Sequence, residues 1–312
     1  MRVFLAGATG AIGRQLVPLL LAAGHEVTGT TRSEQRAAGL RELGAHAAIL
    51  DALDAAAVRS AVAAAAPDAV IHQLTAIPPQ IDPRKMAEQF ELNDRLRSEG
   101  TKILVDAAAQ AGAERIVAQS IAFSYRPGGP GTLHREEDPL ITAAEATPEY
   151  ARSAEAVRAL EQSVLGAGGA VLRYGYFYGP GTAISREGST GRAVAARKLP
   201  IVGGGHGVWP FVHIADAAEA TLAALERGAS GPYNVVDDDP APVREWIPAL
   251  ASALGAPSPR SVPAWLARPL AGRYGLRVMT RAEGASNERA ERELGWQPRY
   301  GSWREGFRTA LG

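Results

Sequence analysis

The chain has 312 residues, of which 46% are hydrophobic and 21% are charged, a composition typical of a protein with a large buried core. Lys and Arg together number 33, as do Asp and Glu, so the net charge gives no indication of a nucleic-acid partner or of binding to an anionic membrane. Cysteine is absent, which excludes disulfides, thiolate catalysis and cysteine-based zinc sites.

The sequence shows no segment that would direct the chain to a membrane. No apolar run reaches the roughly 18 residues that a spanning helix needs, and the first predicted strand starts at once, without a signal peptide. We therefore expect a cytoplasmic protein with no membrane partner.

Residues 1–13 predict a strand, a glycine-rich turn and the start of a helix. Glycine lets the backbone turn tightly and approach a ligand, and the helix start presents free N–H groups to an anion such as pyrophosphate. The spacing is G-x-x-G-x-x-G rather than the G-x-G-x-x-G dinucleotide fingerprint, but its place between strand and helix favours nucleotide binding over a plain turn. The expected cofactor contacts here are Gly7, Thr9, Gly10, Ala11, Ile12 and Gly13.

The end of a second predicted strand, residues 25–31, indicates which cofactor is bound. An acidic residue there would bind the free 2′-hydroxyl of NAD, but Arg32 follows this strand instead. Its guanidinium offers a planar fork of donors suited to a 2′-phosphate. NADP(H) is therefore favoured over NAD(H), and the alternative is that Arg32 is an ordinary solvated charge.

Strands and helices alternate through the rest of the first half, which predicts a doubly wound parallel sheet. Asp51 follows the third strand, where a carboxylate can meet the adenine amino group, and Asp54 is expected to cap the next helix. Arg97, in a long predicted helix, could reach the cleft. The predicted strands are 47–50, 69–73 and 115–120, and the predicted helices are 33–43, 54–65 and 85–111.

The second half continues the alternation with shorter elements. Residues 126–147 are rich in Gly and Pro and are expected to form a mobile loop over the cleft, with His134 at the surface. Asp216 is expected to cap a helix rather than bind a metal with His213, because one such pair makes no metal site. The predicted strands are 170–174, 199–202, 211–214 and 233–236, and the predicted helices are 217–225, 243–254 and 287–294, the last of the chain.

Motifs spread over nearly the whole chain occur together in a recognisable order. Each is weak alone, but the ordered set resembles the extended short-chain dehydrogenase/reductase superfamily, in its NAD(P)-dependent epimerase/dehydratase family. The residues that carry the resemblance are Gly7–Gly13, Asp51, Leu74–Ala76, Gly100–Thr101, Ser120, Leu172–Arg173, Tyr178–Pro180, Phe211–His213 with Asp216, Tyr233–Val235 and Leu294–Trp296.

The resemblance implies a Rossmann-type, doubly wound parallel α/β sheet with a small C-terminal α/β substrate lobe. Residues 1–175, completed by about 210–236, would form the NADP-binding domain, and 176–209 with 237–312 the substrate-binding lobe. The further cofactor contacts expected are Ala52, Leu74, Thr75, Ala76, Ser120 and Tyr174. The expected substrate contacts are Tyr176, Phe177, His206 and Trp209, with the alternative that the aromatic rings only pack the lobe.

The family's chemistry requires a Tyr, a Lys four residues later and a hydroxyl at the end of the fifth strand. The Tyr transfers a proton to or from the substrate, and the Lys lowers the pKa of the Tyr. Tyr150 lies where this Tyr is expected, but the Lys position is Ala154, and Arg152 projects from another side of the helix. Ser120 is favoured over Ile121 as the position of the hydroxyl.

The sequence therefore predicts an NADP-dependent oxidoreductase that acts on a carbonyl or alcohol group of a small organic metabolite. The missing Lys leaves two alternatives open: a redox-silent isomerase, cyclase or epimerase/dehydratase, and an NADP(H)-sensing regulatory protein. Family members often dimerise, so a homodimer is also expected, and Val157, Leu160 and Val164 form an apolar stripe that could face either a partner or the sheet.

Overall fold

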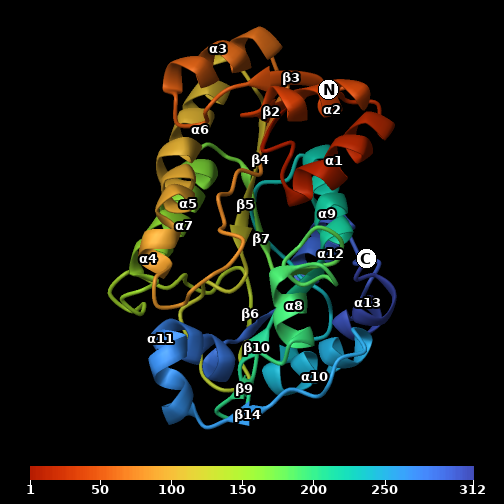
Figure 1. The fold of residues 1–312 in the computed structure, drawn as a ribbon. Helices are drawn as coiled ribbons and strands as arrows, with labels where there is room; N and C mark the ends of the chain where they lie inside the picture. Colours follow the sequence, from red (N-terminus) through yellow and green to blue (C-terminus); the bar gives the residue numbers. More distant parts are fainter.

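The computed structural model describes all residues from 1 to 312 and has a seven-stranded, wholly parallel sheet at its centre (Figure 1). The strand order is β12-β7-β5-β4-β1-β2-β3, so successive strands run outward from β1 and then return to its other side at β4. The doubly wound Rossmann-type prediction is confirmed. The strands are β1 (Arg2–Ala6), β2 (Glu26–Thr31), β3 (His46–Ile49), β4 (Ala69–His72), β5 (Arg115–Ile121), β7 (Ala170–Tyr174) and β12 (Gly231–Val235).

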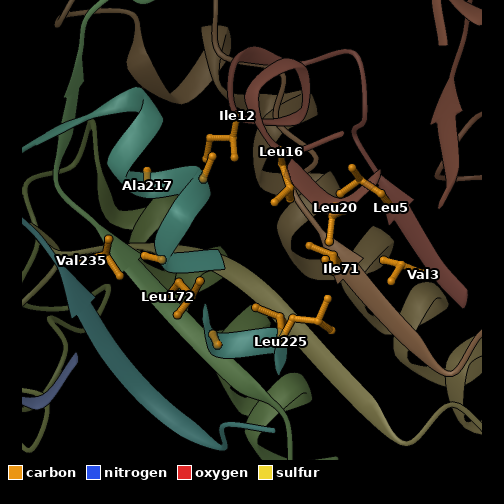
Figure 2. Close-up of a cluster of buried hydrophobic side chains, with 14 of the residues drawn as sticks. Val3, Leu5, Ile12, Leu16, Leu20, Ile71, Leu172, Ala217, Leu225 and Val235 are labelled. Atoms are coloured by element: carbon orange, nitrogen blue, oxygen red, sulfur yellow. The ribbon is translucent and has the colours of Figure 1, made fainter. Parts of the chain in front are cut away.

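Alternate residues of the strands pack into two separate hydrophobic cores, one on each face of the sheet. In β1, Val3 and Leu5 point to one side, and Phe4 and Ala6 point to the other, as the two-residue repeat of a strand requires. Figure 2 shows the first core, where side chains of two helices meet those of the strands. That face carries α1 (Ala11–Ala22), α2 (Glu34–Glu42), α9 (Ile214–Arg227) and α12 (Glu288–Leu294), and the other carries α3 (Ala55–Ala65), α6 (Thr101–Gln110) and α7 (Ala151–Gly166).

The long helix predicted over 85–111 is divided into four segments. These are α4 (Met86–Gln89), α5 (Glu91–Arg95), the π-helix η1 (Leu96–Gly100) and α6. A π-turn changes the face that the following residues present, and such turns are often found at functional sites. Here η1 packs against α7 and contains the buried residue Arg97.

A smaller lobe lies at the lower end of the sheet in Figure 1 and has its own aromatic core. Tyr178, Phe211, Trp246, Trp303 and Phe307 pack together there. Its helices are α8 (Ser189–Ala195), α10 (Val243–Ala253), α11 (Ala264–Arg281) and α13 (Trp303–Thr309). Its short strands pair as β8 (Tyr176–Tyr178) with β11 (Phe211–His213), β9 (Ile201–Val202) with β14 (Ser261–Val262), β10 (Val208–Trp209) with β13 (Ala241–Pro242), and β6 (Leu133–His134) with β15 (Gly284–Ala285).

Several sequence predictions about single elements are wrong. The last helix is α13 rather than the one over 287–294, and α11 was not predicted. The apolar residues Trp265, Leu266 and Leu270 lie exposed on this helix. By contrast, Asp54 caps α3 as predicted, since its carboxylate accepts the N–H groups of the first helical turn.

The apolar stripe Val157, Leu160 and Val164 on α7 is buried against the sheet and does not form a free surface. The homodimer thus stays a prediction without support from these residues. No helix is long and apolar enough to cross a membrane.

Asp216 lies inside α9 instead of capping it, because the helix begins at Ile214 and the His213 ring caps it. The Asp216 side chain is buried, and one of its oxygens accepts the N–H of Tyr300 at 3.1 Å while the other has no partner. Burial therefore raises the pKa of Asp216 to about 6. The folded protein binds the proton more tightly than the unfolded chain does, so the stability associated with this group decreases as the pH rises through about 6.

Replacing Asp216 with Asn is accordingly expected to stabilise the protein at pH 8 by roughly 1–2 kcal/mol, because the buried charge disappears and the acceptor for Tyr300 remains. Urea unfolding at pH 8 and pH 5 measures the effect. The difference between variant and wild type is expected to shrink at pH 5, where Asp216 is mostly protonated. A gain of equal size at both pH values would show that the charge is not responsible.

Candidate active site

A cleft of about 720 Å³ lies at the carboxyl ends of β1 and β4, where the winding of the sheet reverses. Ligands of open α/β sheets bind at this switch point. Gly7 has a φ of +94°, and a Cβ there would lie 2.6 Å from the carbonyl oxygen of Gln73, so only glycine lets the two strand ends approach this closely. The cleft is lined by Gly7, Thr9, Gly10, Thr30, Thr31, Arg32, Arg36, Leu50, Asp51, Ala52, Gln73, Leu74, Thr75, Leu92 and Leu96.

The start of α1 fits a pyrophosphate. No side chain caps this helix, whose N-cap is Gly10, so its first N–H groups are free to bind an anion. A Cβ at Gly13 would lie 2.4 Å from the carbonyl oxygens of Gly7 and Ala8, so glycine at this position lets the helix pack directly on the turn.

Two arginines line the cleft beyond the end of β2. Arg32 follows β2, as the sequence analysis expected, and Arg36 on α2 also lines the cleft. Both are exposed, and neither forms an ion pair with an acidic side chain. Arg36 was missed, although its place one helical turn beyond Arg32 was visible in the sequence.

The other predicted cofactor residues do not line this cleft. Ile12 belongs to the core under α1, and the N–H of Ala76 donates to Asn93. The Tyr174 hydroxyl is buried between Gln73 and Thr221, at 2.9 and 2.7 Å. Ala11 and Gly13 belong to the first turn of α1, and Ser120 lies in a separate buried network described below.

A second cleft, of about 570 Å³, lies beyond the end of β5, between the sheet and the small lobe. It brings together two predicted site residues, Tyr150 and Tyr176, with side chains that the sequence analysis did not identify. Its lining consists of Phe123, Tyr125, His134, Ile141, Thr147, Tyr150, Tyr176, Tyr274, Arg277, Val278, Arg281, Ala282 and Glu283.

Tyr150 is one of four tyrosines that line this cleft. It lies at the N-terminus of α7 and is 7% exposed, and its hydroxyl is 2.9 Å from Ser124 Oγ. Its ring stacks on that of Tyr274, with the centroids 5.0 Å apart. Burial raises the pKa of Tyr150, so the phenol stays protonated at neutral pH and can donate a proton or a hydrogen bond.

The side chain of Arg97 lies close behind Tyr150. It is 5% exposed, its Nε has no hydrogen-bond partner, and no acidic side chain lies within ion-pair distance of it. Burial lowers the pKa of Arg97, whereas the nearby Tyr150 and Asp94 favour its charged form. Arg97 in turn acts on Tyr150: its charge lowers the pKa of the phenol, but burial raises that pKa by more.

The position of the family's Lys, Ala154, is fully buried one turn along α7 from Tyr150. Met86, Phe90 and Ile141 pack around it in an apolar cluster. A lysine at position 154 would have to enter this apolar cluster, and Arg97 is a buried positive charge near Tyr150.

Ser120 does not contact Tyr150. Its hydroxyl donates to Glu161 at 2.6 Å, and Glu161 in turn accepts two hydrogen bonds from Arg173, at 3.0 and 2.7 Å. Arg173 also donates to the hydroxyl of Tyr125. This network joins β5, α7 and β7 below the cleft, and it leaves Ser124 as the hydroxyl adjacent to Tyr150.

His134 is buried in the wall of the second cleft, so the prediction of a surface residue is wrong. One ring nitrogen lies 2.8 Å from Asp138, the other lies 2.8 Å from Glu283, and the ring stacks on Tyr125. Because both nitrogens are engaged, His134 fixes the loop to the end of α11. The rest of the predicted loop includes β6, which pairs with β15.

Three predicted substrate residues lie outside the lining. Phe177 packs against Tyr174, and His206 is exposed and bonded to Arg244. Trp209 stacks behind Tyr176, with centroids 4.1 Å apart, and so supports the wall of the cleft without lining it.

The residues that sequence reasoning missed come from segments far apart in the chain. Phe123 and Ser124 follow β5, and Tyr274, Arg277 and Arg281 lie on α11. The i, i+3, i+4 and i+7 spacing of the α11 residues was a helical signal, but Pro269 and Gly272 obscured it.

The model of the family described as "NAD dependent epimerase/dehydratase family" matches residues 3–236, three quarters of the chain, and includes the nucleotide cleft. The chain belongs to this family. The resemblance noted in the sequence is thereby confirmed. The match covers β1 to β12 and the site residues through Trp209.

Several relatives are reductases or epimerases. A 3-diazoavenalumate denitrifying reductase of Streptomyces sp. is 47% identical over 309 residues, covering 98% of this chain and 99% of the relative. A dTDP-4-dehydro-6-deoxy-D-allose reductase, also of Streptomyces sp., is 28% identical over 278 residues, covering 82% of each chain. The UDP-glucose 4-epimerase of Thermus thermophilus, solved with NAD, superposes with a TM-score of 0.73 at 27% identity, covering 100% of this chain and 98% of that one.

A human epimerase family protein solved with NADPH has the same fold, with a TM-score of 0.75 at 22% identity, covering 100% of this chain and 99% of that one. Together with the family, the reductase relatives show that this chain is an NAD(P)-dependent enzyme of the oxidoreductase or epimerase type.

Proposed function

We propose that this chain is an NADPH-dependent reductase that reduces a carbonyl group of a small organic metabolite. The observation that carries the proposal is the Tyr150 hydroxyl, protonated at neutral pH, bonded to Ser124 and placed in the second cleft. The small lobe, residues 176–209 and 237–312, would close over the substrate. A carbonyl panel assayed with NADPH tests the proposal.

The residues of this chain divide the chemistry among them. Bound NADPH would supply the hydride. Tyr150 donates its proton to the carbonyl oxygen as negative charge develops there, and Ser124 orients the phenol and shares a hydrogen bond with the same oxygen. The raised pKa of Tyr150 favours the reduction direction, since the phenol must begin protonated.

Arg97 would replace the missing Lys as the positive charge near Tyr150. After the proton has left, the phenolate would sit in a buried site, where an unpaired negative charge is costly. Arg97 lies within the same buried region and forms no direct ion pair, so its charge is available to the phenolate.

Arg32 and Arg36 would bind the 2′-phosphate and so select NADPH. Replacing both with Ala is expected to raise the Kd for NADPH by about 10²-fold, because two charge-assisted contacts are lost, and to leave the Kd for NADH within about twofold. Fluorescence titration with each nucleotide measures both constants. Arg41→Ala is the matched control, because Arg41 lies on the same helix but outside the cleft. Equal weakening of both nucleotides would contradict the assignment.

A second function is favoured by Ala154 and by the relative named a denitrifying reductase. If the substrate carries a diazonium group, a hydride forms the new C–H bond while the C–N bond breaks, and its electron pair leaves with N₂. No proton has to be delivered in this step, so the family's Lys is not needed. An aromatic diazonium compound in the same assay, with N₂ release and NADPH oxidation measured together, tests this alternative.

A further inference from the structure

The second cleft has a positive charge that nothing in it compensates. Arg277 and Arg281 lie one turn apart on α11 and both line the cleft, and neither is paired with an acidic side chain. The only carboxylate in the lining, Glu283, is already engaged by His134 and by the N–H groups of Gly128 and Gly129. An anion entering the cleft would therefore meet two free guanidinium groups.

The walls of the cleft are flat and aromatic. Phe123 stacks on Tyr176 with centroids 4.1 Å apart and an interplanar angle of 11°, and Trp209 stacks behind Tyr176. On another side the ring of Tyr274 stacks on Tyr150. Planar rings gain most from such walls, because they bury a large area against aromatic side chains.

The lining offers little to a sugar. It contains no Asn, Gln, Asp or Ser, and its carboxylate and imidazole are bonded to each other. The other polar groups that a sugar would meet are the hydroxyls of Thr147 and the tyrosines and the guanidinium groups of Arg277 and Arg281, so it would find no free carboxylate or amide acceptor. The cleft thus differs in chemistry from one built for a nucleotide sugar, although the fold is shared with enzymes that bind such molecules.

We propose that the substrate is a planar aromatic compound bearing a carboxylate, which Arg277 and Arg281 bind while the ring lies between the aromatic walls. The reacting group is then directed toward Tyr150. This inference rests on the proposed reductase function only for what happens at Tyr150, because recognition of the carboxylate does not require turnover.

Binding to the full chain in the presence of NADP⁺ tests the proposal. Isothermal titration with benzoate and cinnamate is expected to show binding that is at least tenfold tighter than binding of their methyl esters. The double variant Arg277→Ala/Arg281→Ala is expected to weaken binding of the acids by about 10- to 100-fold and to leave the esters unchanged. Arg268→Ala, an exposed position on the same helix, is the control.

Equal binding of acids and esters, no binding of either acid, or tighter binding of UDP-glucose would each overturn the proposal. Because binding is measured without turnover, the result is separate from the proposed reductase function. Selective binding of the acids, with no reduction of any carbonyl or diazonium compound, would support the substrate class and reject the reductase.

Discussion

Replacing Tyr150 with Phe is expected to lower kcat for carbonyl reduction by about 10²- to 10⁴-fold and to leave the Kd for NADPH within about twofold. The phenyl ring keeps its shape, its stacking on Tyr274 and its place in the apolar cluster, so only the proton donor is lost. Loss of absorbance of the reduced nicotinamide over a panel of carbonyl compounds measures the rate. Fluorescence titration measures NADPH binding in the same preparation.

Two serine variants sharpen this test. Ser124→Ala is expected to reduce the rate by about tenfold or more, because the phenol loses the partner that orients it. Ser120→Ala removes a hydrogen bond to Glu161 below the cleft and is expected to leave kcat of the folded enzyme unchanged. The reverse order of effects would restore Ser120 as the catalytic hydroxyl, as the sequence had suggested.

The interpretation of the Tyr150→Phe variant depends on which class of substrate it still turns over. If the variant reduces carbonyl compounds at the wild-type rate, Tyr150 is not the proton donor. If it loses carbonyl reduction but still releases N₂ from a diazonium compound, the second function gains support, since that step needs no proton. If the wild type binds NADPH tightly and turns over neither class, a nucleotide-sensing role becomes the better interpretation.

The fold could be predicted where local sequence determines structure. The strand, turn and helix of residues 1–22 are adjacent in the chain, and glycine spacing and apolar periodicity specify them directly. The π-turn at Leu96–Gly100 was not predicted, because no Pro or capping residue separates it from the helices on either side. His134 carries a polar side chain in a Gly- and Pro-rich segment, and only its partners Asp138 and Glu283 make burial possible.

The two clefts differ in how far the sequence could predict them. The nucleotide cleft is built from strand ends, so residues such as Arg32 and Asp51 have positions that follow from the order of strands. The second cleft is assembled from a loop after β5, the start of α7 and a helix more than a hundred residues later. The contact between Tyr150 and Ser124 depends on the path of a loop, and no periodicity in the sequence encodes that path.

Arg97→Met is expected to change activity and stability in opposite directions. Carbonyl reduction should fall by about 10²-fold, because the phenolate of Tyr150 loses the positive charge that stabilises it in a buried site. The free energy of unfolding should rise by about 1–2 kcal/mol, because a buried guanidinium that forms no direct ion pair is replaced by an apolar chain of similar length. Steady-state kinetics and urea unfolding measure the two effects.

The pH profile distinguishes a role in proton transfer from a merely structural one. In the oxidation of an alcohol the rate should rise with pH as Tyr150 loses its proton, and Arg97→Met should move this rise to higher pH. The other groups that face Tyr150 are unchanged in the variant: Ser124 from the loop after β5, Asp94 from α5, and Tyr274 and Arg277 from α11.

Arg97→Lys supplies the matched control, because it keeps a positive charge on a shorter, more strongly hydrated group. It should retain more activity than Arg97→Met and leave the pH profile nearer that of the wild type. If Arg97→Met loses activity and stability together, Arg97 supports the packing of η1 on α7 and the charge has no catalytic use. If stability rises while activity and the pH profile stay unchanged, the charge of Arg97 has no part in catalysis, and Tyr150 works without a cation.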